Sequence, residues 1–150
     1  MKLTGKEEFI APRAAIWNIL MDTEKLTRIT PGLSHLEATG PDEYVATADV
    51  KIGPVKGSFK GEMSITEKQE EEAFTLNILQ KSKVGNVDAA VRIELAELAP
   101  EQTELSFVGQ AKMSGLLART GARVMTGVAN SLSKQFFAGL REELDASTTG

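Results

Sequence analysis

The sequence contains no cysteine and a single histidine, His35. Without cysteine the chain has no disulfide, no thiolate nucleophile and no thiolate-ligated metal site, and a reducing, cytoplasmic compartment is the expected location. With one histidine, no Ser-His or Cys-His catalytic pair stands out, and no site of imidazole and thiolate ligands can form. His35 lies in a turn-rich stretch, where we expect a surface or partly packed side chain. We therefore expect no catalytic residue, no metal site and no enzymatic activity.

Long apolar runs and an excess of positive charge are also missing. No stretch of about 18 apolar residues occurs and the N-terminus has no apolar run, so we expect neither a membrane-spanning segment nor a signal peptide. The formal net charge of −4 argues against a nucleic-acid-binding protein, which needs a basic face to neutralise phosphates. A length of 150 residues suits a single domain with its own hydrophobic core. We expect residues 145–150 to be a frayed tail.

Two hydrophobic periods divide the chain. Residues 3–10 suit a first strand, and two short helices follow, the second capped by Asp22 and stopped by Pro31 and Gly32. From residue 33 apolar residues alternate with polar ones, which is the period of half-buried strands. Short polar turns join these strands, among them Gly53-Pro54, and this organisation favours an antiparallel meander.

The period becomes helical again after Gly115 and stays so to about Leu144. Thirty residues make a helix of roughly 45 Å, long enough to cross a small domain, and only the one-sided sheet offers it an apolar partner. The sequence therefore predicts an α+β helix-grip fold. In this fold a curved antiparallel sheet of about six to seven strands surrounds a long C-terminal helix, with two short helices after the first strand.

The inner face of the predicted sheet has unusually small side chains. Glycine or alanine occupies several inward positions, namely Ala46, Ala48, Gly57, Gly61, Ala89, Gly109 and Ala111. Small residues on facing surfaces leave volume between them, which indicates an apolar cavity for a lipophilic ligand. The same residues are also typical of bulges and of close packing in a strongly bent sheet. Composition alone favours neither interpretation over the other.

The cavity, if present, is expected between the sheet and the first half of the long helix. The residues predicted to form its wall are Phe9, Ala48, Val50, Phe59, Met63, Leu76, Ala89, Phe107, Ala111, Met113, Leu117, Gly121 and Met125. Glu7 has the inward parity of the first strand, where it is either the polar group of a pocket or the partner of a basic side chain.

Two groups of basic residues are candidates for a partner or membrane surface. Lys51, Lys56 and Lys60 lie on the outer face of one predicted hairpin, and Arg119 and Arg123 are one helical turn apart near the start of the long helix. Basic clusters attract anionic membrane surfaces. Lysines also protect a sheet edge from aggregation or simply solvate a face, and the sequence leaves these alternatives open.

Motifs spread over essentially the whole chain carry a resemblance to a known family. They are Ala11-Pro12-Arg13, Trp17-Asn18-Ile19-Leu20-Met21-Asp22, Ile29-Thr30-Pro31-Gly32, Val50-Lys51-Ile52-Gly53-Pro54-Val55-Lys56-Gly57, Phe59-Lys60-Gly61 and Gly115-Leu116-Leu117-Ala118-Arg119-Thr120-Gly121. Together they resemble the family of the G-type accessory protein of carbon monoxide dehydrogenase, which is part of the START-like and pollen-allergen-like superfamily. The Lys51–Gly57 stretch is the most specific of them.

The resemblance implies a helix-grip fold and a non-catalytic, accessory role. The partner it implies is a molybdenum hydroxylase such as carbon monoxide dehydrogenase, and the role is in its maturation, membrane attachment or electron transfer. It also implies a cavity for a lipophilic molecule, such as the respiratory quinone menaquinone, with no covalent cofactor. Peripheral contact with the inner face of the cell membrane is expected. Because the implied cavity agrees with the small inner residues, we interpret those residues as more typical of a cavity than of close packing.

Two departures from the family pattern bear on these expectations. Many members have cysteine after the Pro-Gly pair, where this chain has Leu33, so a role for that thiol is absent. Members that attach to membranes often carry a C-terminal extension, whereas this sequence ends at Gly150. Either an extension has been removed, or the chain reaches membranes weakly or through its partner.

Two further hypotheses stand beside the binding module. One is an assembly or recruitment factor with a filled core, no ligand and a docking outer face. The other is an enzyme acting on a small apolar or polyketide-like substrate, which we disfavour because Glu7 with Thr4 or Ser82 makes a poor catalytic set.

Overall fold

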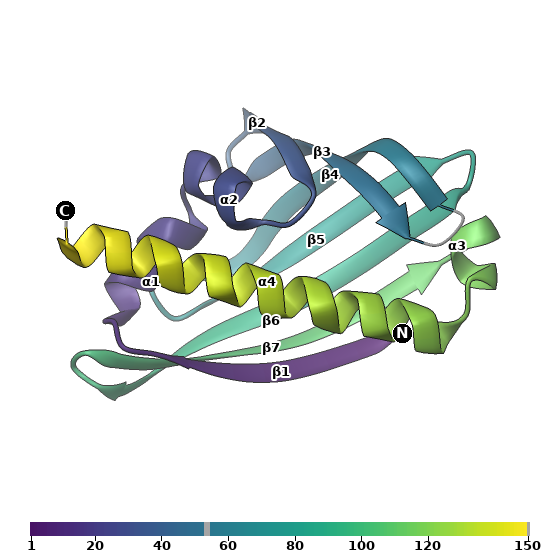
Figure 1. Cartoon of the computed structure of the whole chain (residues 1–150). Coiled ribbons are helices and arrows are strands. Elements are labelled where there is room, and N and C mark those ends of the chain that lie inside the picture. Colours follow the sequence, from purple (N-terminus) through teal and green to yellow (C-terminus); the bar gives the residue numbers. More distant parts are fainter. Residues whose placement is uncertain (53–54, 150) are drawn as a thin grey trace.

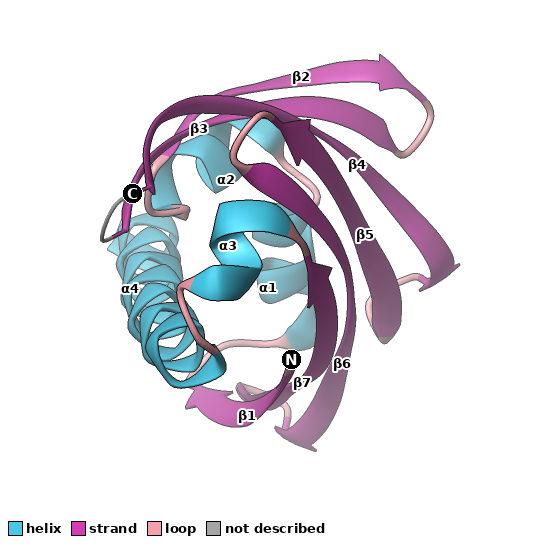
Figure 2. Cartoon of the chain, turned by 90° about the vertical axis from the view of Figure 1, so that its right-hand side faces the viewer, coloured by secondary structure: helices cyan, strands magenta, loops and turns pink. Residues whose placement is uncertain are grey.

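A seven-stranded antiparallel sheet and a long helix form the body of the computed structural model, which describes residues 1–52 and 55–149 (Figure 1). The strands are β1 (Lys2–Phe9), β2 (Leu33–Gly40), β3 (Glu43–Ile52), β4 (Val55–Gln69), β5 (Ala73–Ser82), β6 (Gly85–Ala99) and β7 (Gln102–Met113). Their order across the sheet is β1-β7-β6-β5-β4-β3-β2. Figure 2 shows the sheet curving around the helices, so the predicted helix-grip fold is confirmed. The predicted turn at Gly53-Pro54 lies outside the described residues.

The two short helices predicted after the first strand are α1 (Arg13–Leu20) and α2 (Thr23–Ile29). The Oδ1 atom of Asp22 accepts hydrogen bonds from the backbone N–H groups of Glu24 at 2.9 Å and Lys25 at 3.1 Å. This confirms Asp22 as the N-cap of α2, because these donors have no partner within the helix. The chain then reverses into β2 through Gly32, whose φ of 80° suits glycine far better than other residues.

The predicted long helix is interrupted, and here the prediction was wrong. A short helix, α3 (Gly115–Arg119), is followed by α4 (Ala122–Thr149). Gly121 between them has a φ of 101°, a left-handed conformation that ends a helix. Arg119 and Arg123 therefore lie on different helices, and α4 continues past Leu144 through residues that we expected to fray.

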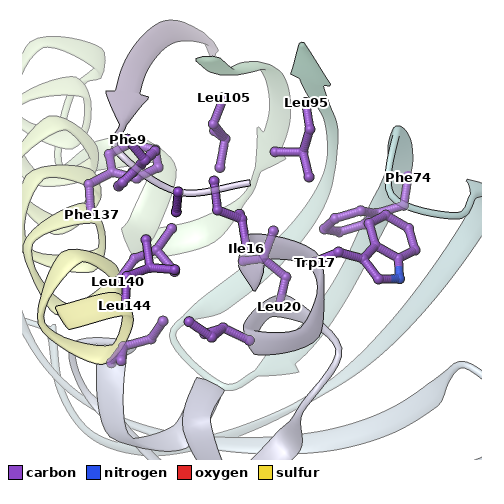
Figure 3. Packing of buried hydrophobic residues seen from close by; sticks show 13 residues of the cluster. Phe9, Ile16, Trp17, Leu20, Phe74, Leu95, Leu105, Phe137, Leu140 and Leu144 are labelled. Atoms are coloured by element: carbon purple, nitrogen blue, oxygen red, sulfur yellow. The ribbon is translucent and has the colours of Figure 1, made fainter. Parts of the chain in front are cut away.

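The hydrophobic core occupies one end of the space between sheet and helices (Figure 3). It joins α1 and the C-terminal half of α4 to strands β1, β5, β6 and β7. Its largest members are Phe9, Ile16, Trp17, Leu20, Phe74, Leu95, Leu105, Phe137, Leu140 and Leu144. Burying such a side chain contributes about 1.5–3 kcal/mol each, so this end of the molecule carries much of the packing energy.

Two ion pairs also hold the C-terminal half of α4. Arg141 donates to Glu7 of β1 at 2.6 Å, and Arg28 of α2 donates to Glu143 at 2.8 Å. Glu7 thus faces a basic side chain, as one of the two expectations for it had stated. The hydrogen bond from Arg28 lowers the pKa of Glu143 below its ordinary value, and the pKa of Arg28 is raised by the same contact. Helix α4 is therefore fixed at its C-terminal half.

Candidate functional site

The register of β3 to β7 places three rows of apolar side chains side by side on the concave face of the sheet. Residues paired across neighbouring strands lie on the same face. The rows are Tyr44, Met63 and Ile78; Ile65, Leu76 and Val91; and Phe74, Ile93 and Phe107. All nine side chains line one cavity, whose floor they form.

The roof of this cavity comes from the helices and from β2. Leu26, Thr30 and Pro31 contribute from α2 and the turn after it, and Leu33 and Leu36 from β2. The middle of α4 closes the opposite side with Leu132, Ser133, Phe136 and Phe137, while Leu20 and Leu105 join the cavity to the core. The cavity thus lies between the sheet, α2, β2 and the middle of α4.

The cavity has a volume of about 360 Å³ and an apolar lining. At a liquid share of about 30 Å³ per molecule, this is the space of roughly a dozen waters. The described lining residues include no charged group, and their polar members are Thr30, Tyr44 and Ser133. The Ser133 hydroxyl donates to the carbonyl of Ala129 at 2.8 Å, so it offers no free donor to a ligand. Such a site favours an apolar molecule over water.

The cavity opens to solvent beside α4. Leu132, which lines it, is 41% exposed, and Leu33, Leu36 and Tyr44 are half-buried. An exposed leucine at the edge of an apolar cavity lets a long apolar molecule pass from the surface to the interior without meeting a charged group. The mouth therefore lies between α4 and the edge formed by β2 and β3.

Three of the residues predicted for the wall, Met63, Leu76 and Phe107, line the cavity. The other predicted positions with described side chains are not among the lining residues. Half-buried positions on the inner face or near the start of α4 are Ala48, Phe59, Ala89, Ala111, Met113, Gly121 and Met125. The side chain of Val50 lies outside the described part of the structure.

Phe9 and Leu117 are placed differently from the prediction. Phe9 is 2% exposed and packs against Phe137 in the core, at 6.1 Å between ring centroids. Leu117 of α3 is buried, and the Cβ that Gly85 lacks would lie 3.4 Å from its side chain. The inward parity of both residues was correct, but the core and α3 take up the space around them.

The cavity lies against the middle of α4, whereas the prediction placed it at the first half of the long helix. Sequence reasoning missed the contribution of α2 and β2. A signal was present, because Leu26 and Ile29 form an apolar stripe on α2, and Leu33 and Leu36 follow it in β2. The two segments cover the edge of the sheet that the helix α4 leaves open (Figure 2).

Both interpretations of the small inner residues apply, at different positions. A Cβ added to Gly5 would lie 2.7 Å from the ring of Phe107, and one added to Gly109 would lie 3.4 Å from Val91. These glycines give space to neighbouring side chains. Ala48 and Ala89, in contrast, stay half-buried instead of packing closely against a helix. The concave face is therefore filled at the core end and open beyond it.

The predicted surface residues are exposed. Lys51, Lys56 and Lys60 of β3 and β4 are exposed, as are Arg119 of α3 and Arg123 of α4. The turn between β3 and β4 and the start of α4 lie at the same end of the molecule as α3 (Figure 1).

The remaining sequence expectations concern histidine, metals and the membrane. The His35 side chain is 65% exposed and lies 3.9 Å from Glu37, which confirms a surface position. The described residues contain no group of three histidine, cysteine or acidic side chains placed to hold a metal ion. Among the described helices, none combines the length and apolar character needed to cross a bilayer.

Comparison with known proteins gives a family and a set of similar structures. The family model for CoxG, the G-type component of carbon monoxide dehydrogenase, matches residues 5–145. No curated protein matches the chain. A conserved protein from Geobacillus kaustophilus has a similar structure, with 28% identity, a TM-score of 0.93 and coverage of 98% of this chain and 97% of that one.

More distant structures share the fold alone. A START superfamily protein from Mycobacterium smegmatis is 13% identical with a TM-score of 0.74, and each chain is covered to 97%. The Zhui aromatase/cyclase from a Streptomyces species is 12% identical with a TM-score of 0.74, over 97% of this chain and 93% of that one. At such low identity these matches support the START-like fold and say nothing about ligand or activity.

Proposed function

The chain belongs to the CoxG family of carbon monoxide dehydrogenase components, and on this premise we propose that it is a non-catalytic binding module. It holds a lipophilic molecule in the cavity between the sheet and α4. As its family name indicates, it serves an enzyme of the carbon monoxide dehydrogenase type, a molybdenum hydroxylase, which it links to the membrane. The ligand best suited to this role is a respiratory quinone such as menaquinone.

The observation that carries the proposal is the apolar cavity of about 360 Å³. Pockets for small molecules measure about 300–1,000 Å³ and are mostly apolar. Each square ångström of apolar ligand surface removed from water contributes about 25 cal/mol, so an isoprenoid chain gains affinity without specific polar contacts. The floor of branched and aromatic side chains supports this mode of binding, because it presents a continuous apolar surface.

The lining also supports a role without catalysis. Its described polar groups are hydroxyls, and Glu7, the acid of the poor catalytic set, is bonded to Arg141 at 2.6 Å. General acid–base catalysis requires a titratable group within hydrogen-bond reach of the reacting atom. The cyclase named above shares only the fold, and its activity is not carried over to this chain.

Membrane contact is proposed for one end of the molecule, called here the basic end. Its exposed basic residues are Lys51, Lys56, Lys81, Lys83, Lys112, Arg119 and Arg123. They belong to the β3–β4 and β5–β6 hairpins, the end of β7, α3 and the start of α4, which gather at one end in Figure 1. Two exposed acids, Asp49 and Asp88, belong to the same strands, so the excess there is clearly basic. Each such residue near an anionic bilayer contributes about 1 kcal/mol.

A binding assay with a cavity-filling variant tests the ligand part of the proposal. Trp17 is the single tryptophan, and its ring lies 5.7 Å from that of Phe74, which lines the cavity. Menaquinone bound there should quench Trp17 fluorescence. Val91→Phe puts a larger ring into the cavity floor and should weaken menaquinone binding at least about tenfold, because the ring takes volume from the ligand.

The control is the same substitution on the outer face of the sheet. Val108 of β7 is 46% exposed, and Val108→Phe should leave the affinity unchanged. Equal affinity in wild type and Val91→Phe, with both proteins folded, would contradict binding in this cavity. Absence of any saturable quenching in wild type would favour the alternative, a recruitment factor that binds no ligand.

A further inference from the structure

One polar side chain, Gln80, stands in the row of inner residues next to the cavity floor. This row crosses the sheet from β2 to β7 as Leu36, Ala46, Gly61, Gln80, Val87 and Met113. Leu36 at its edge lines the cavity, and Ile78, two residues from Gln80 on the same face of β5, forms part of the floor. Gln80 is therefore the amide group nearest in sequence register to the apolar floor.

The amide of Gln80 is buried without a hydrogen-bond partner. Its Nε2 atom is shielded from solvent and has no partner among the described residues. A buried donor without a partner is costly, and native proteins keep one only where something else satisfies it. The neighbours that share its row are mostly apolar or small, so the surrounding side chains offer no acceptor.

Glycine at position 61 accommodates this amide. A Cβ at Gly61 would lie 3.4 Å from the Cβ of Gln80 and 3.7 Å from its Cγ. With Ala46 next in the row, the positions beside Gln80 on β4 and β3 are both small. The sheet thus leaves space along one side of the glutamine side chain, which a ligand group can occupy.

We infer that Gln80 binds the polar end of the ligand, by donating a hydrogen bond from Nε2 to a carbonyl oxygen. This inference rests on the proposed function, because it assumes a lipophilic guest in the cavity. It narrows the ligand class to apolar molecules that carry a hydrogen-bond acceptor, such as a quinone or an acyl compound, and disfavours pure hydrocarbons. It also orients the guest, with its oxygen toward Gln80 and its apolar part over the floor.

The test compares two probes that differ only in their oxygens. One is a short-chain menaquinone, and the other is the naphthalene hydrocarbon with the same methyl and isoprenoid substituents but no carbonyl. Binding of both is measured by competition with a fluorescent fatty-acid analogue in wild type, Gln80→Met and Gln110→Leu. Methionine has nearly the shape of glutamine and no donor, while Gln110 is exposed on β7 and serves as the outer-face control.

The expected result is a loss of about tenfold in menaquinone affinity for Gln80→Met, with little change for the hydrocarbon or for Gln110→Leu. The infrared carbonyl stretch of the bound quinone should also shift to higher frequency in Gln80→Met, as a carbonyl does when it loses a hydrogen bond. Gln80→Leu provides a second variant, should the methionine protein fold poorly.

Two results would overturn the inference while leaving the proposed function intact. One is unchanged menaquinone affinity in Gln80→Met, as expected if water satisfies the amide. The other is an equal loss for both probes, which indicates a purely structural role for Gln80. If wild type binds neither probe, the proposed function fails and the inference fails with it.

Discussion

Thr103 and Gln80 are polar residues on the inner face of the sheet, and they differ in whether the protein satisfies them. Thr103 is 0% exposed, and its hydroxyl donates to the carbonyl of Ala11 at 2.8 Å. This bond ties β7 to the segment that leads into α1. The Nε2 atom of Gln80 has no such partner among the described residues. A satisfied buried group stabilises the fold, whereas an unsatisfied one lowers stability and is typical of a site that receives something from outside.

At Thr103 we predict a measurable loss of stability on removal of the hydroxyl. Thr103→Val keeps the shape of the side chain and leaves the Ala11 carbonyl without its donor, so the free energy of unfolding should fall by about 1–3 kcal/mol. Urea denaturation at constant m-value measures this change. The control Thr4→Val, at an exposed position of β1, should change it by less than about 0.5 kcal/mol. Equal effects of the two substitutions would contradict the assigned role of the bond.

Individual side chains were predicted from the sequence only in part. Alternation in the strands correctly placed Met63, Leu76 and Phe107 on the concave face. It could not distinguish a cavity wall from a filled core, because parity says which face a side chain is on and nothing about what lies opposite. Phe9 shows this limit, since its inward position is occupied by Phe137 from α4.

The elements of the fold follow the sequence more closely than the site does. The alternation predicted over residues 43–52 corresponds to β3 (Glu43–Ile52), and the cap at Asp22 begins α2. The break before α4 was missed, although Gly121 was visible as a glycine within a helical pattern. Helical periodicity continues through a single glycine, and only the backbone conformation shows that the helix ends there.

Helix α4 is held at one half, and the ion pair to α2 gives this arrangement a dependence on pH. Because the hydrogen bond from Arg28 lowers the pKa of Glu143, the pair stabilises the fold at neutral pH. That contribution is lost as the pH falls through the lowered pKa of Glu143. Glu143→Gln should therefore be slightly less stable than wild type at pH 7, and the difference should disappear in strong acid.

Thermal unfolding of both proteins from pH 7 to pH 3 measures this difference. The effect at pH 7 should be small and should decrease at high salt, because Arg28 is largely exposed. Glu142, which is exposed on the same helix, gives the control Glu142→Gln. A stability difference for Glu143→Gln that persists unchanged below pH 3 would contradict the electrostatic explanation.

Over the whole molecule, charge is divided between two ends although the net charge is only −4. The basic end lies at α3, and the opposite end carries exposed acids in the β4–β5 and β6–β7 turns, among them Glu70, Glu71 and Glu101. Figure 1 shows these turns at the far end from α3. Total charge could not predict this division, because it depends on which hairpin turns the antiparallel meander brings together.

This division predicts salt-dependent binding to anionic membranes. Wild type should bind vesicles containing anionic lipid at low salt and release them at high salt, as screening shortens the range of the interaction. The triple substitution Lys83→Gln, Arg119→Gln, Arg123→Gln should weaken vesicle binding at least about tenfold. Co-sedimentation with the vesicles measures the bound fraction.

The matched control removes the same charge elsewhere. Lys6→Gln, Lys25→Gln, Lys134→Gln takes three positive charges from β1, α2 and the middle of α4, and should reduce vesicle binding much less. Equal losses in the two triple variants would show that net charge, and not the basic end, controls membrane contact.

The central claim is that a lipophilic guest completes the interior of this fold. Native mass spectrometry tests it most directly, on protein purified from cells and again after incubation with liposomes that contain menaquinone. We predict a folded protein that carries a single lipophilic ligand, or takes one up from the liposomes, and that loses it in Val91→Phe. A mass equal to the chain alone under both conditions would contradict the claim.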